Sequence, residues 1–242
     1  MLIYGKHPIL EALKANKSLN KILIQNELKS ELLPAIKEFA AQKEIPVQFV
    51  PLAKLDRLVK ENHQGIVGLI SMIEYYKVED ILDQVYQKGQ FPLFLILDEI
   101  TDVRNFGAIA RTALNAGVHA IIVPFKGSAN INPEAMKASA GALNKIPVCR
   151  EQNLKQTIKN LKLNGVQIVA TATNTNKLIF NIDLTVPTAI ILGSEDVGIN
   201  PLHLREADEI VKVPMSGELD SYNVSVTAGI VLYEVLRQQL AK

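Results

Sequence analysis

Residues 93–117 read LFLILDEITDVRNFGAIARTALNAG, an apolar run followed by a polar turn and a helical segment. A largely apolar run is typical of a strand that is buried on both faces of a sheet. Five runs of this kind occur in the carboxyl-terminal part of the chain, at residues 93–97, 120–123, 166–170, 188–192 and 209–213. Helical segments separate most of them, at about residues 107–116, 134–143, 154–163 and 224–240. The alternation predicts an α/β domain with a parallel, helix-flanked sheet over residues 93–242.

A smaller α/β domain is predicted over residues 1–73. Its expected helices lie near residues 8–15, 31–41 and 52–59, and its expected strands near residues 21–24, 47–50 and 66–73. The following stretch, residues 74–92, is more polar and contains Gly89. We therefore expect a linker over residues 74–92, with one helical stretch near residues 80–86.

The composition favours a soluble globular protein. The chain has 242 residues, of which 48% are apolar, enough for packed cores. No window approaches the roughly 20 apolar residues of a membrane span, and the first residues lack the zones of a signal peptide, so we expect a cytoplasmic protein. The net charge of +1 neither favours nor excludes nucleic acid, because affinity for phosphates depends on local clusters of Lys and Arg.

Several classes of site find no support in the sequence. The single cysteine, Cys149, cannot form an intrachain disulfide, and we expect it to be a small residue near a strand end. The four histidines, His7, His63, His119 and His203, lack metal-binding spacing, so we expect no metal. Neither a GxGxxG nor a GxxxxGK[ST] motif is present, so a cofactor must be held differently from a Rossmann or P-loop nucleotide.

Three segments that directly follow predicted strands carry the most unusual residues. Open α/β sheets usually bind ligands at this place, beyond the carboxyl ends of the strands. The first is the turn and helix after Leu97, in which Asn105 and Arg111 lie six residues apart. Arg104 and Arg111 are able to donate hydrogen bonds to an anion at the amino end of this helix. A capped surface helix with solvated arginines explains the same pattern.

The second segment, residues 191–201, reads ILGSEDVGINP directly after a buried strand. Gly193 and Gly198 permit a close approach of the backbone to a ligand, and Glu195 lies at the carboxyl end of the strand. Ordinary turn chemistry explains this stretch equally well.

The third segment, residues 211–234, gathers polar residues where the last helix begins: Ser221, Tyr222, Asn223 and Ser225. Ser221 or Asn223 is expected to cap that helix. Capping does not require all four, so the cluster also indicates a binding or catalytic role.

Together the three segments resemble the three motifs of the SpoU family in the SPOUT superfamily of RNA methyltransferases. The pattern N-x-G-x-x-x-R-[TS]-A is matched by Asn105, Gly107, Arg111, Thr112 and Ala113. The pattern L-G-x-E-x-x-G is matched by Leu192, Gly193, Glu195 and Gly198. The third motif, I-P-M-x-G with S-L-N-V-S-V-A and a closing L-Y-E, is similar to residues 213–217, 221–227 and 232–234. Upstream, IYGKHP at residues 3–8 and HQGIV at residues 63–67 are similar to the substrate-binding domain of the bacterial large-subunit rRNA guanosine methyltransferases.

The resemblance implies a fold, a cofactor and a partner. It implies a deep trefoil knot in the carboxyl-terminal domain, S-adenosylmethionine bound in the knot, and a homodimer formed through that domain. The residues implied to bind the cofactor are Leu192, Gly193, Val213, Met215, Tyr222 and Ser225. Val213 replaces the family's usual Ile and Tyr222 its usual Leu. Either Tyr222 alters the adenine pocket, or the contact at this position is made by the backbone, which tolerates both Tyr and Leu.

The resemblance also implies the catalytic residues Arg111, Asn105, Glu195 and Asn223. A guanidinium is almost always protonated, which makes Arg111 an awkward general base. Our hypothesis is that Arg111 binds the phosphate beside the target ribose and stabilises the developing alkoxide, while the phosphate or water accepts the proton. The other three residues are expected to orient Arg111 and the hydroxyl.

The expected substrate is a guanosine of 23S rRNA, which the upstream stretches favour. Two alternatives stay open: a tRNA guanosine 2′-O-methyltransferase and an RNA-binding module without catalysis. The amino-terminal domain is expected to bind RNA by its shape and exposed bases. Its cations either help to bind phosphates or form an ordinary solvated surface: Lys6, Lys14, Lys17, Lys21 and Arg57.

Overall fold

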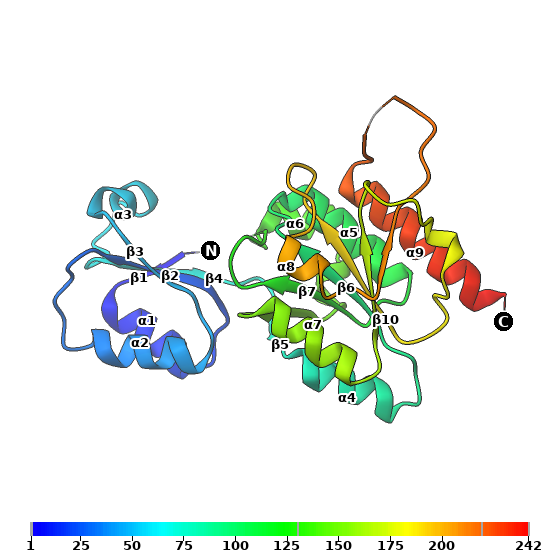
Figure 1. Cartoon of the computed structure of the whole chain (residues 1–242). Coiled ribbons are helices and arrows are strands. Elements are labelled where there is room, and N and C mark those ends of the chain that lie inside the picture. The colour runs from blue at the N-terminus through cyan, green and yellow to red at the C-terminus, as the bar shows by residue number, and fades with distance from the viewer. Residues whose placement is uncertain (1, 130, 219, 242) are drawn as a thin grey trace. The chain divides into compact units, whose positions relative to one another are not determined.

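The computed structural model describes residues 2–129, 131–218 and 220–241, so Met1 and Lys242, the ends of the two expected domains, lie outside the described residues. The chain divides into two compact units between Glu74 and Tyr75. Both units mix helices and strands (Figure 1), so the expected α/β class is confirmed. The trefoil knot stays a prediction.

The first unit contains a four-stranded sheet in the order β1-β4-β2-β3. Its elements, in chain order, are β1 (Leu2–Tyr4), α1 (Lys6–Lys14), β2 (Leu19–Gln25), α2 (Leu33–Gln42), β3 (Val47–Val50), α3 (Leu52–Leu58) and β4 (Ile66–Ile70). Residues of α1 and α2 share one apolar cluster with β2, and α3 shares a second cluster with residues of β2, β3 and β4. Strand β1 was not expected, because three residues are too few to show an alternating pattern.

The second unit contains a seven-stranded sheet in the order β11-β9-β10-β6-β7-β8-β5, and all its strand pairs are parallel. Its strands are β5 (Tyr75–Tyr76), β6 (Leu93–Asp98), β7 (Ala120–Pro124), β8 (Val148–Glu151), β9 (Gln167–Thr171), β10 (Thr188–Gly193) and β11 (Glu209–Val211). All five expected strands are present, which confirms the parallel sheet. β5 and β8 were not expected, since both are short.

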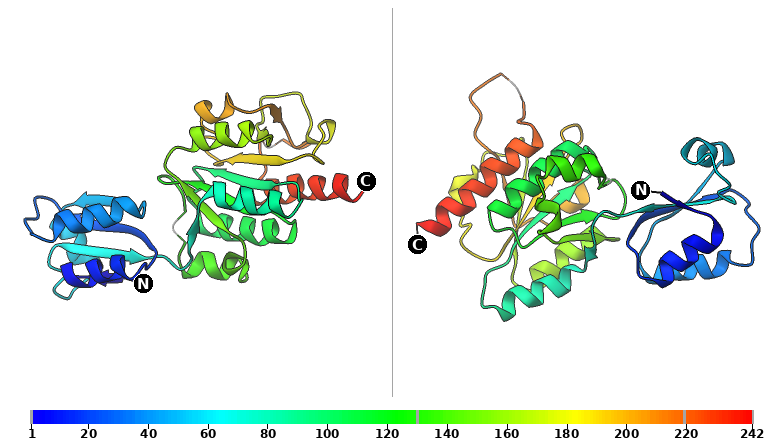
Figure 2. Two further views of the ribbon diagram at one scale, coloured as in Figure 1. Left: turned by 90° about the horizontal axis from the view of Figure 1, so that it is seen from below. Right: turned by 180° about the vertical axis from the view of Figure 1, so that it is seen from behind.

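Helices cover both faces of this sheet (Figures 1 and 2). They are α4 (Val78–Gln87), α5 (Val103–Asn115), α6 (Pro133–Ala138), α7 (Leu154–Leu163), α8 (Pro201–Leu204) and α9 (Val224–Leu240), with short 3-10 turns at Ala142–Asn144 and Ile179–Asn181. Residues of α4 and α7 share one apolar cluster with the sheet, and α5 packs against α6 and α9. Among the described residues, no helix is long and apolar enough to cross a membrane.

The segment expected as a linker, residues 74–92, contributes structure to the second unit. β5 pairs with β8, and α4 inserts Val78, Ile81, Leu82 and Val85 into the apolar cluster of this unit. These four residues follow the i, i+3, i+4, i+7 spacing of an amphipathic helix, and α4 contains the helical stretch expected near residues 80–86. The boundary between the units therefore lies at the start of the segment.

Cys149 lies on β8 and is fully buried. Burial raises the pKa of its thiol, and the thiolate is the reactive form. We expect a thiol reagent at pH 8 to leave the native protein unmodified and to modify one thiol per chain in guanidinium chloride. Mass spectrometry counts the modified thiols. Rapid modification of the native protein would contradict the buried position of Cys149.

Candidate functional site

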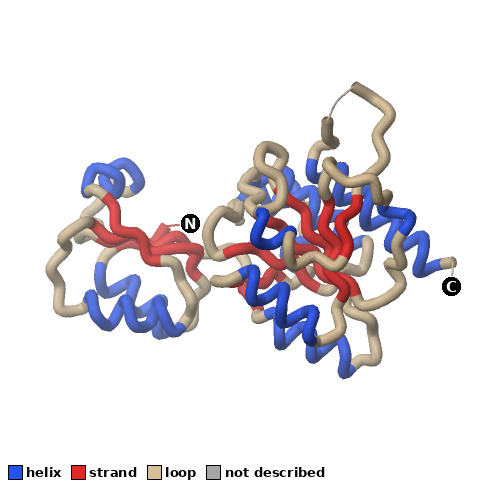
Figure 3. Tube along the Cα trace, in the orientation of Figure 1, coloured by secondary structure: helices blue, strands red, loops and turns tan. Residues whose placement is uncertain are grey.

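A pocket of about 460 Å³ lies where the loops after three neighbouring strands meet. The loops that follow β9, β10 and β11 appear in tan in Figure 3. Its lining comes from four stretches of chain, numbered 171–174, 192–199, 212–215 and 220–227, together with Leu204. The carboxyl ends of parallel strands are where α/β sheets usually bind ligands. The sequence indicated the second, third and fourth stretches.

The loop after β10 returns across its own beginning. A Cβ atom on Gly193 would lie 2.1 Å from the carbonyl carbon of Gly198 and 2.2 Å from the amide nitrogen of Ile199. The Gly198 N–H donates to the Ser194 carbonyl at 2.9 Å, and Gly198 has a φ of +76°. Gly193 is therefore required by the close approach of two backbone segments, and Gly198 by its left-handed conformation.

Three of the four residues expected in catalysis form one hydrogen-bonded cluster. The Asn105 side-chain amide donates to Glu195 Oε1 at 3.1 Å, and the Asn223 amide donates to the same oxygen at 2.5 Å and to Asn105 Oδ1 at 3.1 Å. The backbone N–H of Val224 also donates to Glu195 Oε1, at 3.1 Å. Asn105 comes from α5, Glu195 from the loop after β10, and Asn223 from the start of α9. We call these three residues the polar cluster.

Asn223 and Asp102 also cap the two helices that carry the polar cluster. Asn223 Oδ1 accepts from the N–H of Ser225 at 3.0 Å and from its hydroxyl at 2.5 Å. Asp102 Oδ1 accepts from the N–H groups of Arg104 and Asn105 at 2.9 and 2.7 Å. This cap begins α5 four residues before the expected start. Asn223 thus serves as both a cap and a member of the cluster.

The fourth expected catalytic residue, Arg111, is not hydrogen-bonded to the polar cluster in the part of the chain that the structure describes. Its side chain is exposed on α5, does not line the pocket, and has no hydrogen bond or ion pair with any described residue. The expectation that the polar cluster orients Arg111 stays a prediction. Arg111 is available to a ligand that approaches α5 from solvent.

Arg104 does not offer a free anion site. Its Nε donates to Glu134 Oε1 at 2.6 Å, and this hydrogen bond raises the pKa of Arg104. The first amide groups of α5 are already bonded to Asp102. The contacts of Arg104 therefore agree with a capped surface helix and not with an anion-binding site.

Five of the six residues implied to bind a cofactor line the pocket: Leu192, Gly193, Val213, Met215 and Tyr222. The sixth, Ser225, does not line it. The Tyr222 side chain is 41% exposed, and its hydroxyl lies 3.5 Å from the Pro214 carbonyl, so the ring spans the loop before α9. The described residues contain no group of three His, Cys, Asp or Glu side chains suited to a metal ion.

The stretch 171–174, which lines the pocket after β9, was not expected to be part of the site. Thr171 is the last residue of β9, and Ala172, Thr173 and Asn174 directly follow this strand. A polar turn at the carboxyl end of a predicted parallel strand was the signal that could have identified them.

The two upstream motifs meet in the first unit. The Gly5 N–H donates to the Ile66 carbonyl at 3.1 Å, and the Lys6 N–H donates to Gln64 Oε1 at 3.2 Å. His63 is buried; its Nδ1 accepts from the Gly65 N–H at 3.1 Å, so its Nε2 carries the proton that is shared with Asp56 at 2.9 Å. The start of α1, the loop before β4 and α3 therefore form one connected edge.

Comparison with known proteins gives consistent results for both units. The SpoU rRNA Methylase family model matches residues 92–233, and the model for RNA 2′-O ribose methyltransferase substrate binding matches residues 2–76. YacO of Bacillus subtilis (strain 168), assigned by its name to the TrmH family of tRNA/rRNA methyltransferases, is 36% identical over 238 residues, covering 98% of this chain and 95% of that protein.

Solved structures are similar over nearly the whole chain. A crystal structure described as an RNA 2′-O ribose methyltransferase is 26% identical with a TM-score of 0.58, covering 99% of this chain and 89% of that chain. The SpoU methyltransferase AviRb from Streptomyces viridochromogenes, solved in complex with the cofactor AdoMet (S-adenosylmethionine), is 23% identical with a TM-score of 0.61. That match covers 100% of this chain and 91% of AviRb, and it supports the fold.

Proposed function

The chain belongs to the SpoU rRNA Methylase family and is an RNA 2′-O-methyltransferase, and from this premise we propose that it methylates a guanosine ribose of 23S rRNA. S-adenosylmethionine is the methyl donor of the family. The observation that carries the proposal is that three motif segments, from α5, the loop after β10 and the start of α9, meet at one hydrogen-bonded cluster beside one pocket.

The pocket suits S-adenosylmethionine. Its volume of about 460 Å³ lies within the usual range for small-molecule sites. Apolar residues of its lining, such as Leu192 and Val213, match the adenine ring, and the acidic Glu195 and Asp196 match the positive charges of the cofactor. When bound, the cofactor supplies an electrophilic methyl group. The residues present thus fit the group in shape and in charge.

The polar cluster is suited to orient the ribose hydroxyl. Methyl transfer needs the attacking oxygen in line with the methyl group, and such positioning contributes much of the barrier reduction. Glu195 Oε1 accepts three hydrogen bonds, which holds the Asn105 and Asn223 amides in fixed directions. We assign Asn105, Glu195 and Asn223 the role of positioning the 2′-hydroxyl.

Arg111 acts on the RNA in this proposal. Its guanidinium is exposed on α5 and is able to form two parallel hydrogen bonds to a phosphate. Bound to the phosphate beside the target ribose, it stabilises the negative charge that develops on the attacking oxygen. The proton passes to that phosphate or to water.

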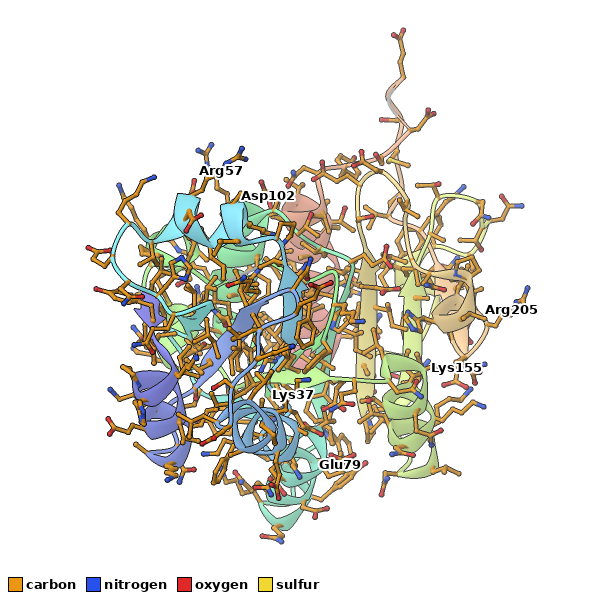
Figure 4. The ribbon with its side chains drawn as sticks, turned by 90° about the vertical axis from the view of Figure 1, so that its left-hand side faces the viewer. Lys37, Arg57, Glu79, Asp102, Lys155 and Arg205 are labelled. Atoms are coloured by element: carbon orange, nitrogen blue, oxygen red, sulfur yellow. The ribbon has the colours of Figure 1, made fainter. Side chains whose placement is uncertain are left out.

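The connected edge of the first unit is proposed to contact the RNA substrate. It contains Lys6 at the start of α1 and Lys54 and Arg57 on α3. Figure 4 shows the Arg57 side chain extending outward from α3, whereas Lys37 lies on α2, which packs on the other face of this sheet. Lysine and arginine side chains on one edge attract phosphates, and this attraction weakens with salt.

A homodimer is proposed to form through the second unit. On α9 the side chains of Val226, Tyr233 and Leu240 are 48%, 68% and 85% exposed. They are spaced by seven residues, so they form one apolar stripe along the helix. An exposed apolar stripe marks an interaction site, and a second copy of this chain is the partner that the family implies. Like the cytoplasmic location, the dimer stays a prediction.

Two other functions compete with rRNA methylation. A tRNA substrate is supported by the name of YacO, which includes both tRNA and rRNA. A module that binds RNA without catalysis is opposed by the intact polar cluster and by Arg111. The three functions differ in which RNA acquires a methyl group.

The decisive experiment measures methyl transfer from labelled S-adenosylmethionine to unmodified large-subunit rRNA and, separately, to unmodified tRNA. The modified ribose is mapped by its resistance to alkaline cleavage. We expect one methylated guanosine in the rRNA. Transfer to tRNA alone would replace the proposal by the tRNA alternative, and RNA binding without transfer to either RNA, naked or assembled, would favour the inactive module.

A further inference from the structure

A buried carboxylate lies directly beneath the loop that forms the pocket. Asp98 is the last residue of β6, its side chain is 1% exposed, and its strand partner on β10 is Gly193. Asp98 Oδ2 accepts two hydrogen bonds, from the backbone N–H of Asn200 at 2.8 Å and from Nδ1 of His203 at 2.7 Å. Asp98 thus connects the central strand to the far end of the loop after β10.

The position of these bonds determines where the loop closes. The loop leaves β10 at Gly193 and returns over it at Gly198 and Ile199, as shown by the 2.1 Å approach of a Cβ placed on Gly193. The next residue, Asn200, is the one whose N–H is bonded to Asp98. Asn200 also caps α8 through its side chain, which accepts from Leu202 N–H at 2.9 Å. The returning half of the loop is therefore fixed at its last residue.

The two halves of the loop have separate anchors. Glu195, in the outgoing half, is held by Asn105, Asn223 and the Val224 N–H. The returning half contributes Val197, Gly198 and Ile199 to the pocket lining and depends on Asp98. A change at Asp98 or His203 is expected to move the pocket wall without breaking the bonds of the polar cluster.

We propose that Asp98 and His203 are positioning residues that hold the returning half of the loop closed against the S-adenosylmethionine pocket. This inference rests on the proposed function only in the identity of the ligand. A buried carboxylate needs its hydrogen-bond donors, because an unsatisfied charged group away from water is costly. His203 supplies one of the two donors, so its removal leaves the Asn200 N–H as the single remaining bond to Asp98 Oδ2.

The test uses three variants of His203 in the full-length protein. His203→Ala removes the donor. His203→Asn replaces it, since the amide nitrogen of Asn occupies about the position of Nδ1, whereas His203→Gln places its amide too far along the side chain. His119→Ala is the matched control, because His119 Nδ1 accepts from the Leu93 N–H at 3.1 Å, at the opposite end of the same strand. If the loss of any histidine contact to β6 weakens cofactor binding, His119→Ala will show the same loss as His203→Ala.

Two readouts separate positioning from general stability. The first is the dissociation constant of S-adenosylmethionine by calorimetry, with kcat measured at saturating cofactor. We expect His203→Ala and His203→Gln to raise the dissociation constant by about 10-fold, the value of one charge-assisted hydrogen bond, with kcat within about threefold of the parent. His203→Asn restores the affinity, and His119→Ala leaves it unchanged.

The second readout is amide hydrogen exchange without cofactor. The amides of Gly198 and Asn200 should exchange faster in His203→Ala than in the parent, and His203→Asn should restore their protection. Unchanged affinity and exchange in His203→Ala, or equal losses in His119→Ala, overturn the inference. If the parent binds no S-adenosylmethionine, the proposed function fails, and the exchange measurement still decides whether Asp98 and His203 hold the loop.

Discussion

Gly193→Ala is expected to lose S-adenosylmethionine binding almost completely while the protein stays folded. The new Cβ would lie 2.1 Å from the Gly198 carbonyl carbon and 2.4 Å from its oxygen, so the returning backbone has to move. Overpacking of this kind costs about 1–3 kcal/mol. Strain of about 3 kcal/mol on the binding conformation corresponds to a loss of affinity of about 100-fold. Calorimetric titration with S-adenosylmethionine measures the change directly.

Gly68→Ala is the control for this prediction. Gly68 also lies in a buried strand, but a Cβ there would come no closer than 3.6 Å to a side-chain atom of Ile9, an ordinary contact. Its cofactor affinity should equal that of the parent. If Gly193→Ala binds the cofactor as tightly as Gly68→Ala does, the pocket after β10 is not the cofactor site.

Arg111→Lys is expected to lower kcat by about 100-fold or more, the usual cost of removing one donor that stabilises transition-state charge. Lysine keeps the charge but loses the planar fork that binds a phosphate through two hydrogen bonds. Because Arg111 does not line the pocket, the dissociation constant of S-adenosylmethionine should not change. Single-turnover methylation of rRNA at saturating cofactor measures the effect.

Arg104→Lys provides a matched comparison on the same helix. Arg104 is exposed in the first turn of α5, and its guanidinium forms an ion pair with Glu134. An exposed ion pair contributes little, so this variant should methylate at nearly the parental rate. Near-normal turnover of Arg111→Lys, or an equal loss in both variants, would show that Arg111 has no special role.

The strands β6, β7, β9 and β10 were predictable because each is a largely apolar run of five or six residues that is recognised without knowledge of its partners, and the shorter β11 was predicted as part of residues 209–213. Strand β8 (Val148–Glu151) was missed because a short segment ending in Arg150 and Glu151 becomes a strand only through pairing with β7 and β5. For helix α4 the sequence predicts a helical stretch near residues 80–86, but not that this helix packs on the sheet of the second unit. Its burial depends on the sheet that it covers.

The class of fold, the family and the three members of the polar cluster could be inferred from the amino-acid sequence alone. Residue types and local spacing carry this information, because periodicity and motifs extend over only a few neighbouring residues. Asn105, Glu195 and Asn223 were recognised in this way, and so were five residues of the pocket lining.

Which of these residues contact one another follows from the three-dimensional fold. Asn105 and Asn223 are 118 positions apart and Asp98 and His203 are 105 apart, yet each pair is joined by a hydrogen bond. The fold likewise added residues 171–174 to the pocket and left Arg111 outside the pocket lining. Contacts between distant segments depend on strand order and on where each loop returns, and these follow from the packing of the whole unit and not from any local stretch of chain.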